Sequence, residues 1–318
     1  MSTAFLFPGQ GAQNPGFLHQ LRGHSAVEST LNEAATVLGC DPLSLDSADA
    51  LRKTVPLQLA VLVAGVATTR ALADCEITPS VVAGHSIGTF TAAVATGALS
   101  FPDALRLVRV RAECMQSAYP HGYGMMAVVG LGERRVRAII QDIRKATTGP
   151  SAGIYIAAIN APDQIAISGT HAALDSAATA ARRAGARKVV TLAVAVPSHC
   201  ELLDGVSEQL RSELRSINLV QPRVTYLCNH SARAVRSADD IREDLIRGVA
   251  TPVRWHESTE VMAELGARLF IELPPGAFLS RLARAAFPDR RALAICESEI
   301  AGIAQIAKRD CAARLYVN

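Results

Sequence analysis

Residues 81–99 read VVAGHSIGTFTAAVATGAL, which is a short apolar run, a turn bounded by glycines and an alanine-rich stretch. The run at 81–83 has the length of a buried strand, and residues 90–99 have the composition of a helix. The turn between them carries the pattern G-x-S-x-G, with its serine at Ser86. A strand, this turn and a helix predict a nucleophile elbow, in which glycines permit the strained bend that exposes the serine hydroxyl. A glycine-rich turn without chemistry is the alternative interpretation.

Strands and helices alternate on both sides of this elbow. Residues 3–7 are an apolar run that ends at the turn Pro8-Gly9-Gln10-Gly11, which predicts a strand followed by a sharp bend. Two helices with a proline in the first turn are predicted over 56–74 and 102–119. The alternation resumes after Pro197, with helices predicted over 200–215, 239–248 and 252–265 and strands over 224–228 and 268–273.

The middle of the chain has a different order of elements. Its pattern predicts strands over 125–129, 154–159, 164–168 and 187–196, and helices over 133–146 and 171–184. The resulting order, βαββαβ, is that of a ferredoxin-like unit, a four-stranded antiparallel sheet with two helices on one face. The sequence therefore predicts an α/β protein with an α/β-hydrolase-like large domain (residues 1–124 and 197–318) and an inserted ferredoxin-like small domain (residues 125–196).

Composition narrows the classes of function. The 32 Lys and Arg residues against 29 Asp and Glu give a net charge of +3, too near balance for a nucleic-acid groove or a polybasic membrane patch. The seven cysteines have neither a C-x-x-C pair nor metal-ligand spacing, so we expect reduced thiols and no metal site. Charges, glycine or proline interrupt every apolar run, so no stretch is expected to approach the length of a membrane span. We expect a soluble, cytoplasmic globular protein.

A serine nucleophile needs a base within hydrogen-bonding distance, usually a histidine, and the chain has eight histidines. His85 adjoins the serine, but at a sharp turn its side chain should point away from Ser86 and pack elsewhere. His199 follows the last predicted strand of the small domain, where a loop can reach over a cleft between domains. It is favoured over the remaining histidines, which stay open. The backbone N–H of Ile87 and one from the 8–11 turn are candidates for stabilising an oxyanion.

Five motifs occur along the chain in a fixed order. They are Phe7-Pro8-Gly9-Gln10-Gly11-Ala12-Gln13, Gly84-His85-Ser86-Ile87-Gly88, Arg111 with Met115-Gln116, Asn160-Ala161-Pro162 with Ile167-Ser168-Gly169, and Val196-Pro197-Ser198-His199. With these motifs the sequence resembles the malonyl-CoA:acyl-carrier-protein transacylase family, from about residue 4 to about residue 285.

The resemblance implies a role for each matching residue. Ser86 would carry the acyl group and His199 would be the base. The N–H groups of Gln10 and Ile87 would hold the oxyanion, and Arg111 would pair with the free carboxylate of a malonyl group. The resemblance further implies a ping-pong acyltransferase that takes malonyl-CoA as substrate and needs no metal and no tightly bound cofactor.

The chemistry of arginine supports the role assigned to Arg111. A planar guanidinium can hold a carboxylate with two parallel, charge-assisted hydrogen bonds. An acetyl group would leave the guanidinium unpaired in a largely apolar cleft, so the site would select by penalty as well as by attraction. Arg109, two positions earlier, is expected on the opposite side of the same helix as an ordinary solvated arginine.

Two departures from the family pattern bear on the pathway. Gly248 stands where the family usually has a glutamine that helps to orient the base; a backbone carbonyl could still do this, whereas a side-chain role would be lost. Pro274-Pro275-Gly276 replaces a Gly-Pro-Gly turn. This variant, with the segment 119–125, resembles the epsilon subunit of malonate decarboxylase. In that branch the acceptor would be the small acyl carrier subunit of the same complex, which bears a dephospho-CoA-derived arm.

We therefore expect malonyl transfer to the pantetheine-type arm of an acyl carrier protein, with a decarboxylase complex as the setting. Other subunits of that complex are possible partners, whereas nucleic acid and membranes are not. Carrier proteins are typically acidic, which makes several surface cations candidates for docking: Arg182, Arg183, Arg187, Lys188, Arg281 and Arg284. The alternatives are a transacylase of fatty-acid or polyketide synthesis, a serine hydrolase or thioesterase, and a catalytically silent interaction subunit.

Overall fold

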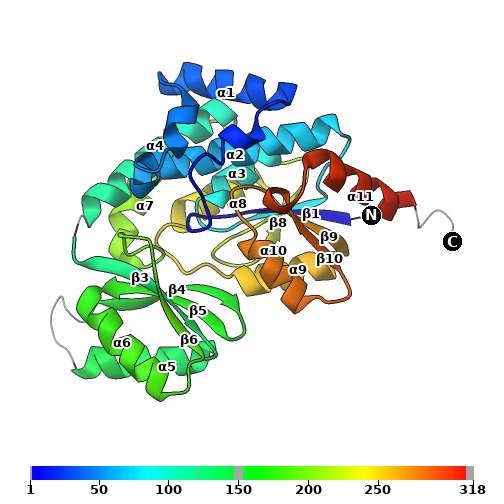
Figure 1. The fold of residues 1–318 in the computed structure, drawn as a ribbon. Helices are drawn as coiled ribbons and strands as arrows, with labels where there is room; N and C mark the ends of the chain where they lie inside the picture. The colour runs from blue at the N-terminus through cyan, green and yellow to red at the C-terminus, as the bar shows by residue number, and fades with distance from the viewer. Residues whose placement is uncertain (1, 120, 147–152, 313–318) are drawn as a thin grey trace.

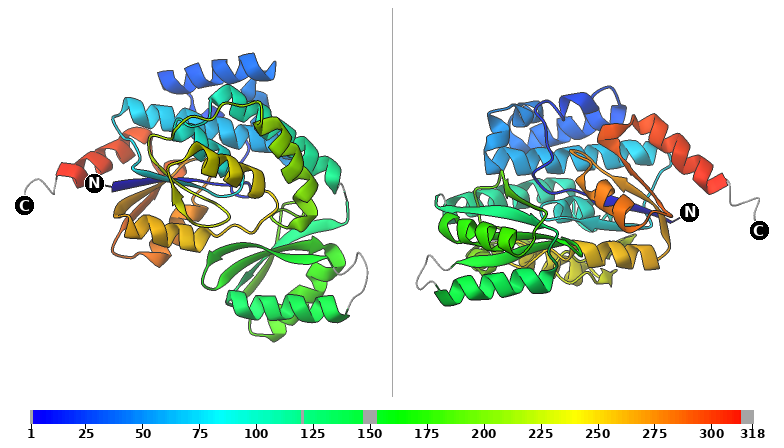
Figure 2. Two further views of the ribbon diagram at one scale, coloured as in Figure 1. Left: turned by 180° about the vertical axis from the view of Figure 1, so that it is seen from behind. Right: turned by 60° about the horizontal axis from the view of Figure 1, so that its bottom comes forward.

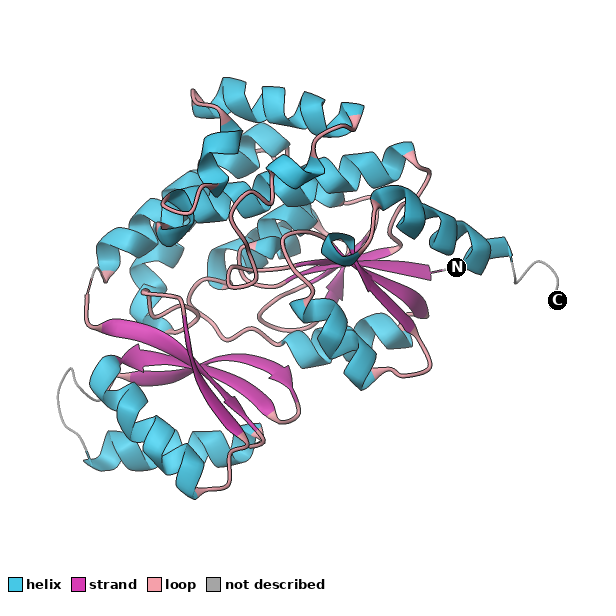
Figure 3. Ribbon diagram, in the orientation of Figure 1, coloured by secondary structure: helices cyan, strands magenta, loops and turns pink. Residues whose placement is uncertain are grey.

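The computed structural model describes residues 2–119, 121–146 and 153–312, and these ranges bound every structural statement below. Two β-sheets organise the molecule, each with helices on its outer surface (Figures 1 and 3). The larger sheet has the strand order β10-β9-β1-β2-β7-β8. Its strands are β1 (Ser2–Phe7), β2 (Val81–Gly84), β7 (Thr225–Leu227), β8 (Ala234–Val235), β9 (Ala267–Glu272) and β10 (Arg291–Ala294). All neighbours pair in parallel except β7 and β8, which are antiparallel.

Helices cover both faces of the larger sheet (Figure 1). They are α1 (Ser25–Leu38), α2 (Thr54–Asp74), α3 (Gly88–Ala95), α4 (Phe101–Ala118), α7 (Asp204–Leu214), α8 (Ala238–Arg247), α9 (Trp255–Glu264), α10 (Phe278–Ala286) and α11 (Ile300–Ala312). Short 3-10 turns lie at His19–Leu21, Pro42–Asp46, Ala50–Arg52, Glu201–Leu203 and Ile295–Glu297. Because side chains alternate along a strand, Phe5 and Phe7 of β1 join the core formed with α1 to α4, whereas Ala4 and Leu6 face the core formed with α9 and α10.

The smaller sheet contains β3 (Tyr123–Val129), β4 (Ile154–Ala161), β5 (Gln164–Thr170) and β6 (Lys188–Leu192). Its order is β4-β5-β3-β6 with every pair antiparallel, and α5 (Glu133–Ala146) and α6 (His171–Arg183) cover one face over a separate core. This is the predicted ferredoxin-like unit, and Figure 2 shows it as a lobe beside the larger sheet. The predicted fold class is confirmed, while the domain boundaries stay a prediction.

Backbone hydrogen bonds join the small sheet to the large unit. Val253, just before α9, donates its N–H to Ala157 O at 2.9 Å, and Ile159 donates its N–H to Val253 O at 2.8 Å. The pairing amounts to an isolated parallel bridge between Ala158 and Val253. The other face of the small sheet therefore packs on the large unit, where Met125, Ala157 and Ala158 share a core with α9.

The expectation that no stretch approaches the length of a membrane span is wrong. Among the described residues, α2 is long and apolar enough to cross a membrane by length and composition. Yet 78% of its most apolar window is buried inside the molecule, and its Leu, Val and Ala residues contribute to the main core. The length of this apolar run is explained by burial on several sides rather than on one face.

Several elements differ from those expected. The helix predicted over 90–99 begins at Gly88 and ends at Ala95, because Gly97 adopts φ 78°, a left-handed conformation that ends a helix. The strand predicted over 187–196 stops at Leu192, and the helix predicted over 200–215 is divided into a 3-10 turn and α7. The sequence pattern did not indicate α1, α10, α11, β8 or β10.

Candidate active site

Ser86 lies at the turn from β2 to α3, with φ 56° in the left-handed region. The glycines of the motif are required by space. A Cβ at Gly88 would overlap the carbonyl oxygen of Phe7, and a Cβ at Gly84 would overlap the backbone N of Thr89. The turn is therefore a strained strand–turn–helix elbow that presents the serine side chain at the carboxyl ends of β1 and β2.

His199 lies beside this serine, on the segment that leads from β6 back to the large unit. Its Nε2 is 2.8 Å from Ser86 Oγ, and its Nδ1 is 2.7 Å from the carbonyl oxygen of Gly248. The backbone of His199 has φ 64°, and its N–H donates to Val249 O at 2.9 Å. Glycine thus supplies through its carbonyl a contact with the histidine that needs no side chain at position 248.

The protonation of His199 follows from these contacts. Burial, with smaller effects from the charges of Arg111 and His85, lowers the pKa of His199 to about 3. The ring is therefore neutral near pH 7. Because a carbonyl oxygen can only accept, Nδ1 carries the proton and Nε2 is free to accept the proton of the Ser86 hydroxyl.

Arg111 of α4 is 2% exposed and reaches the same serine. Its Nη2 lies 3.3 Å from Ser86 Oγ, and its Nη1 donates to Gln58 Oε1 at 2.5 Å. Burial lowers its pKa to about 10, so it stays charged at neutral pH. No carboxylate within the described ranges compensates this charge. A buried, uncompensated cation beside a nucleophile favours an anionic substrate.

Arg109 departs from expectation. It is half-buried, and its Nη2 donates to the carbonyl oxygen of Leu38, the last residue of α1. The guanidinium stabilises the negative end of that helix instead of lying free in solvent. The pattern around residue 109 held no sign of this, because α1 itself was not predicted.

The turn after β1 lies against the elbow. Phe7 and Gly84 are paired across the sheet, and a Cβ at Gly9 would lie 3.4 Å from Ser86 Cβ. Gln10 lines the cavity next to Ser86, and Ile87 is the N-cap residue of α3. Their N–H groups thus come from the two segments that flank the serine. Their use as oxyanion donors stays a prediction.

A cavity of about 910 Å³ lies next to Ser86 and His199. Ser86, His199, Gln10 and Gln58 line it from the large unit, and the small sheet provides a wall that includes Asn160. Residues 274–278, Arg281 and 295–299 also line it. Within the described part of the chain, no group of three or more His, Cys, Asp or Glu side chains could hold a metal ion.

His85 contacts the small sheet and also lines the cavity with Ser86 and His199, so its expected orientation away from Ser86 stays a prediction. Its Nε2 lies 3.0 Å from Asn160 Oδ1 of the small sheet, its ring centre is 5.7 Å from that of Trp255, and burial lowers its pKa. Sequence reasoning missed two polar residues next to the reactive groups. Gln58 was visible as a single amide inside the apolar run of residues 57–67, whereas Asn229, which accepts the N–H of Ser86, carried no signal.

A strained serine, a neutral histidine at hydrogen-bonding distance and a buried arginine in this two-sheet fold are the groups expected of an acyltransferase. Residues 4–315 match the family model described as "Acyl transferase domain". The chain belongs to this family and, within it, to the malonyl-CoA:acyl-carrier-protein transacylases.

Relatives and solved structures support that assignment. The chain is 37% identical over 299 residues to the malonyl CoA-acyl carrier protein transacylase of Haemophilus influenzae, covering 92% of this chain and 94% of the relative. It is 36% identical over 289 residues to that of Escherichia coli K12, covering 88% and 91%. An acyl-carrier-protein S-malonyltransferase from Burkholderia pseudomallei superposes with a TM-score of 0.89 at 35% identity, covering 96% of this chain and all of that one.

A further solved structure shows a relative with a partner. It is described as a malonyl-transacylase in complex with the acyl carrier protein of a type II polyketide synthase. The chain matches it with a TM-score of 0.88 at 32% identity, covering 94% of this chain and 97% of that one.

Proposed function

We propose that the protein transfers a malonyl group from malonyl-CoA to the prosthetic-group thiol of an acyl carrier protein through a malonyl-serine ester. The observation that carries this proposal is the charged, uncompensated guanidinium of Arg111, 3.3 Å from Ser86 Oγ. A thioester whose acyl group ends in a carboxylate would satisfy that cation at the site of reaction.

In the first half-reaction, His199 Nε2 takes the proton of the Ser86 hydroxyl as Oγ bonds to the thioester carbonyl carbon. The carbonyl electron pair moves onto oxygen, where the N–H groups of Gln10 and Ile87 would stabilise the negative charge. When this pair returns, the carbon–sulfur bond breaks. The CoA thiolate takes the proton from His199 and leaves as a thiol, and the malonyl ester remains on Ser86.

The second half-reaction repeats these steps with the carrier. The thiol of the pantetheine-type arm gives its proton to His199 and attacks the ester carbonyl. Collapse of the adduct expels Ser86 Oγ, which recovers the proton from His199. Water could replace the thiol, as in a hydrolase or thioesterase, so the fate of the ester separates those functions from transfer.

Intact mass spectrometry after incubation with malonyl-CoA tests the proposal directly. Wild-type protein should gain one malonyl group, and Ser86→Ala should gain none. Arg111→Ala should lose malonyl loading markedly and gain relative activity with acetyl-CoA. An unmodified wild type, or a labelled Ser86→Ala, would sink the ester mechanism, and an unchanged acyl preference in Arg111→Ala would sink the carboxylate assignment. Release of free malonate as the main product with a carrier thiol present would favour a hydrolase.

The relatives named above favour a carrier of fatty-acid or polyketide synthesis. None of them is a malonate decarboxylase subunit. The decarboxylase setting is the second candidate, and it rests on the segment 119–125 and on Pro274-Pro275-Gly276. Transfer rates to a carrier with a 4′-phosphopantetheine arm and to one with a dephospho-CoA-derived arm would decide between the two.

The proposed carrier must deliver its arm to the cavity. Two of the candidate docking arginines already have partners, since Arg187 pairs with Asp163 and Arg284 pairs with Glu297. Arg281 is exposed and lines the cavity. We therefore place Arg281 first among the docking candidates, and Arg281→Glu should raise KM for the carrier more than KM for malonyl-CoA.

A further inference from the structure

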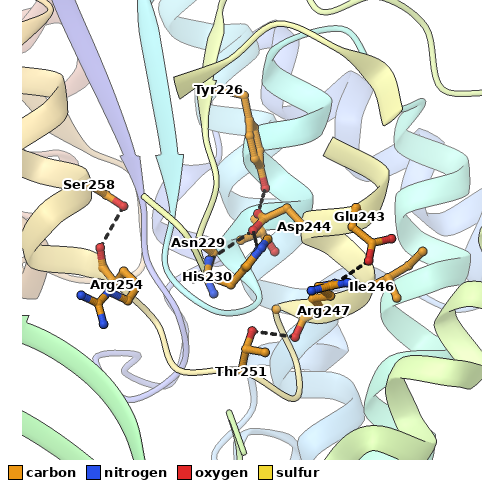
Figure 4. A network of polar contacts seen from close by, with 12 residues as sticks. Tyr226, Asn229, His230, Glu243, Asp244, Ile246, Arg247, Thr251, Arg254 and Ser258 are labelled. Carbon is orange, nitrogen blue, oxygen red and sulfur yellow. Dashed lines mark hydrogen bonds and ion pairs between the residues drawn. The ribbon is translucent and has the colours of Figure 1, made fainter. Parts of the chain in front are cut away.

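A buried polar cluster, drawn in Figure 4, consists of residues that do not line the cavity that the substrate would occupy. Its centre is Asp244 of α8, whose side chain is fully buried. One carboxylate oxygen accepts from the Tyr226 hydroxyl at 2.7 Å. The other accepts from the backbone N–H of His230 at 3.2 Å and lies 2.7 Å from His230 Nδ1. Because a carboxylate only accepts, Nδ1 of His230 carries a proton here.

The loop that contains Asn229 and His230 joins Asp244 to the nucleophile. Asn229 precedes His230, and its Oδ1 accepts the backbone N–H of Ser86 at 3.1 Å. This hydrogen bond fixes a residue in the left-handed region, where a serine stays only when its surroundings hold it. The carbonyl of Asn229 in turn accepts the N–H of Arg254 at 2.8 Å, so the loop is tied on two sides.

The carboxyl end of α8, the helix of Asp244, contacts the base His199. Gly248 at the end of α8 donates its N–H to the carbonyl of Asp244 at 2.8 Å, and its own carbonyl holds Nδ1 of His199 at 2.7 Å. The next residue, Val249, accepts the backbone N–H of His199. A Cβ at Gly248 would lie 3.5 Å from Asn229 Nδ2, so the two supports are packed against each other.

We propose that Asp244 and Asn229 are positioning residues. They hold the loop at 229–230, which contacts Ser86, against residues 248–249, which contact His199. They thereby maintain the distance of 2.8 Å between Ser86 Oγ and His199 Nε2. Burying a carboxylate is costly unless its oxygens are hydrogen-bonded, and the gain here is registry between Ser86 and His199, which both have a left-handed backbone. This inference rests on the proposed roles of Ser86 and His199, and it concerns no group that touches the substrate.

The test measures how fast a fluorophosphonate probe modifies Ser86, followed by intact mass, because this reaction needs the Ser86–His199 pair but no malonyl group. Asp244→Ala should slow labelling by about 10- to 100-fold, the cost of a misplaced reacting pair. Asp244→Asn should restore the rate to within about threefold of wild type, since its amide oxygen can face His230 while the hydroxyl of Tyr226 rotates to accept from the amide nitrogen.

Asp46→Ala is the matched control. Asp46 is 1% exposed and, like Asp244, accepts from a backbone N–H and contacts a histidine Nδ1, those of Leu18 and His19. Its loss should lower thermal stability but change the labelling rate less than about twofold, because it holds neither reactive residue. If Asp46→Ala slows labelling as much as Asp244→Ala, or if folded Asp244→Ala is labelled at the wild-type rate, the proposal is wrong.

Asn229→Ala provides an independent variant should Asp244→Ala not fold. It should slow labelling by at least about tenfold, and an unchanged rate overturns the proposal. Treating the same samples with malonyl-CoA distinguishes the proposed malonyl transfer from the proposed positioning role. A wild type that reacts with the probe but not with malonyl-CoA would contradict the malonyl function alone, whereas one that does not react with the probe would contradict the activated serine and the positioning role together.

Discussion

The low pKa of His199 predicts an unusual pH dependence for the formation of the malonyl-serine ester. The assay compares the rate of ester formation at about pH 7.5 with the rate at about pH 5. With a pKa of about 3, about 99% of the imidazole is still neutral at pH 5. A histidine with the ordinary pKa of about 6.5 would be neutral in only about 3% of molecules. The two cases differ by about 30-fold in the fraction of protein with a base able to accept a proton.

The same shift sets a stability trend with a definite sign. The pKa of His199 is lower in the folded state than in the unfolded chain, so the unfolded chain binds more protons between about pH 6.5 and pH 3. The contribution of His199 to the free energy of unfolding is therefore lost as the pH falls through that window. A pKa shift of this size changes the free energy of unfolding by at most about 5 kcal/mol.

Rapid-quench intact mass measurements from pH 5 to pH 8, under single-turnover conditions, check the kinetic part. The acylation rate should fall less than about threefold at the acid end. A tenfold fall per pH unit below about pH 6.5 would refute the argument, because it is the behaviour of an ordinary histidine. His199→Gln is the control for stability, since its free energy of unfolding should fall less than that of wild type between about pH 6.5 and pH 3.

Three further perturbations have definite outcomes. Gly88→Ala should destabilise the fold by about 3 kcal/mol or more, seen in denaturant unfolding, because the added Cβ overlaps a backbone carbonyl of β1; a soluble variant of wild-type stability would contradict the required glycine. Gln58→Leu removes the acceptor of Arg111 Nη1 and should lower kcat/KM for malonyl-CoA by about 10- to 100-fold, measured by thiol release, with Leu57→Met as a neighbouring control. Burial raises the pKa of Glu272 to about 7, so the contribution of Glu272 to stability should decline as pH rises from about 4.5 to 7, by up to about 3 kcal/mol. Melting curves should show this decline as the difference in stability between wild type and Glu272→Gln.

The local chemistry of the elbow was readable from sequence. Gly84 and Gly88 lie where an added Cβ would meet backbone atoms, so the two glycines of the motif reflect a requirement of space. The βαββαβ order was equally readable, because its strands and helices have distinct periods and clear turns between them.

The contacts between distant segments were not readable. His199 could be favoured only by its place at a domain junction and by resemblance, since its distance to Ser86 depends on a separation of 113 residues. Asp244 and Asn229 are single polar residues with no motif, and their partners lie on other elements. Arg109 was misjudged for the same reason, because its acceptor lies 71 residues earlier in a helix that was not predicted.

The bridge between Ala158 and Val253 has a consequence for protein engineering. Because the small sheet shares backbone hydrogen bonds with the strand-like segment before α9, the insert is not an independent cassette between two junctions. A chimera that exchanges only the insert with that of a relative would keep Val253 from one parent and its backbone partners from the other. Grafts made to change acyl selectivity should therefore exchange the segment around residue 253 together with the insert, so that both halves of the bridge come from one source.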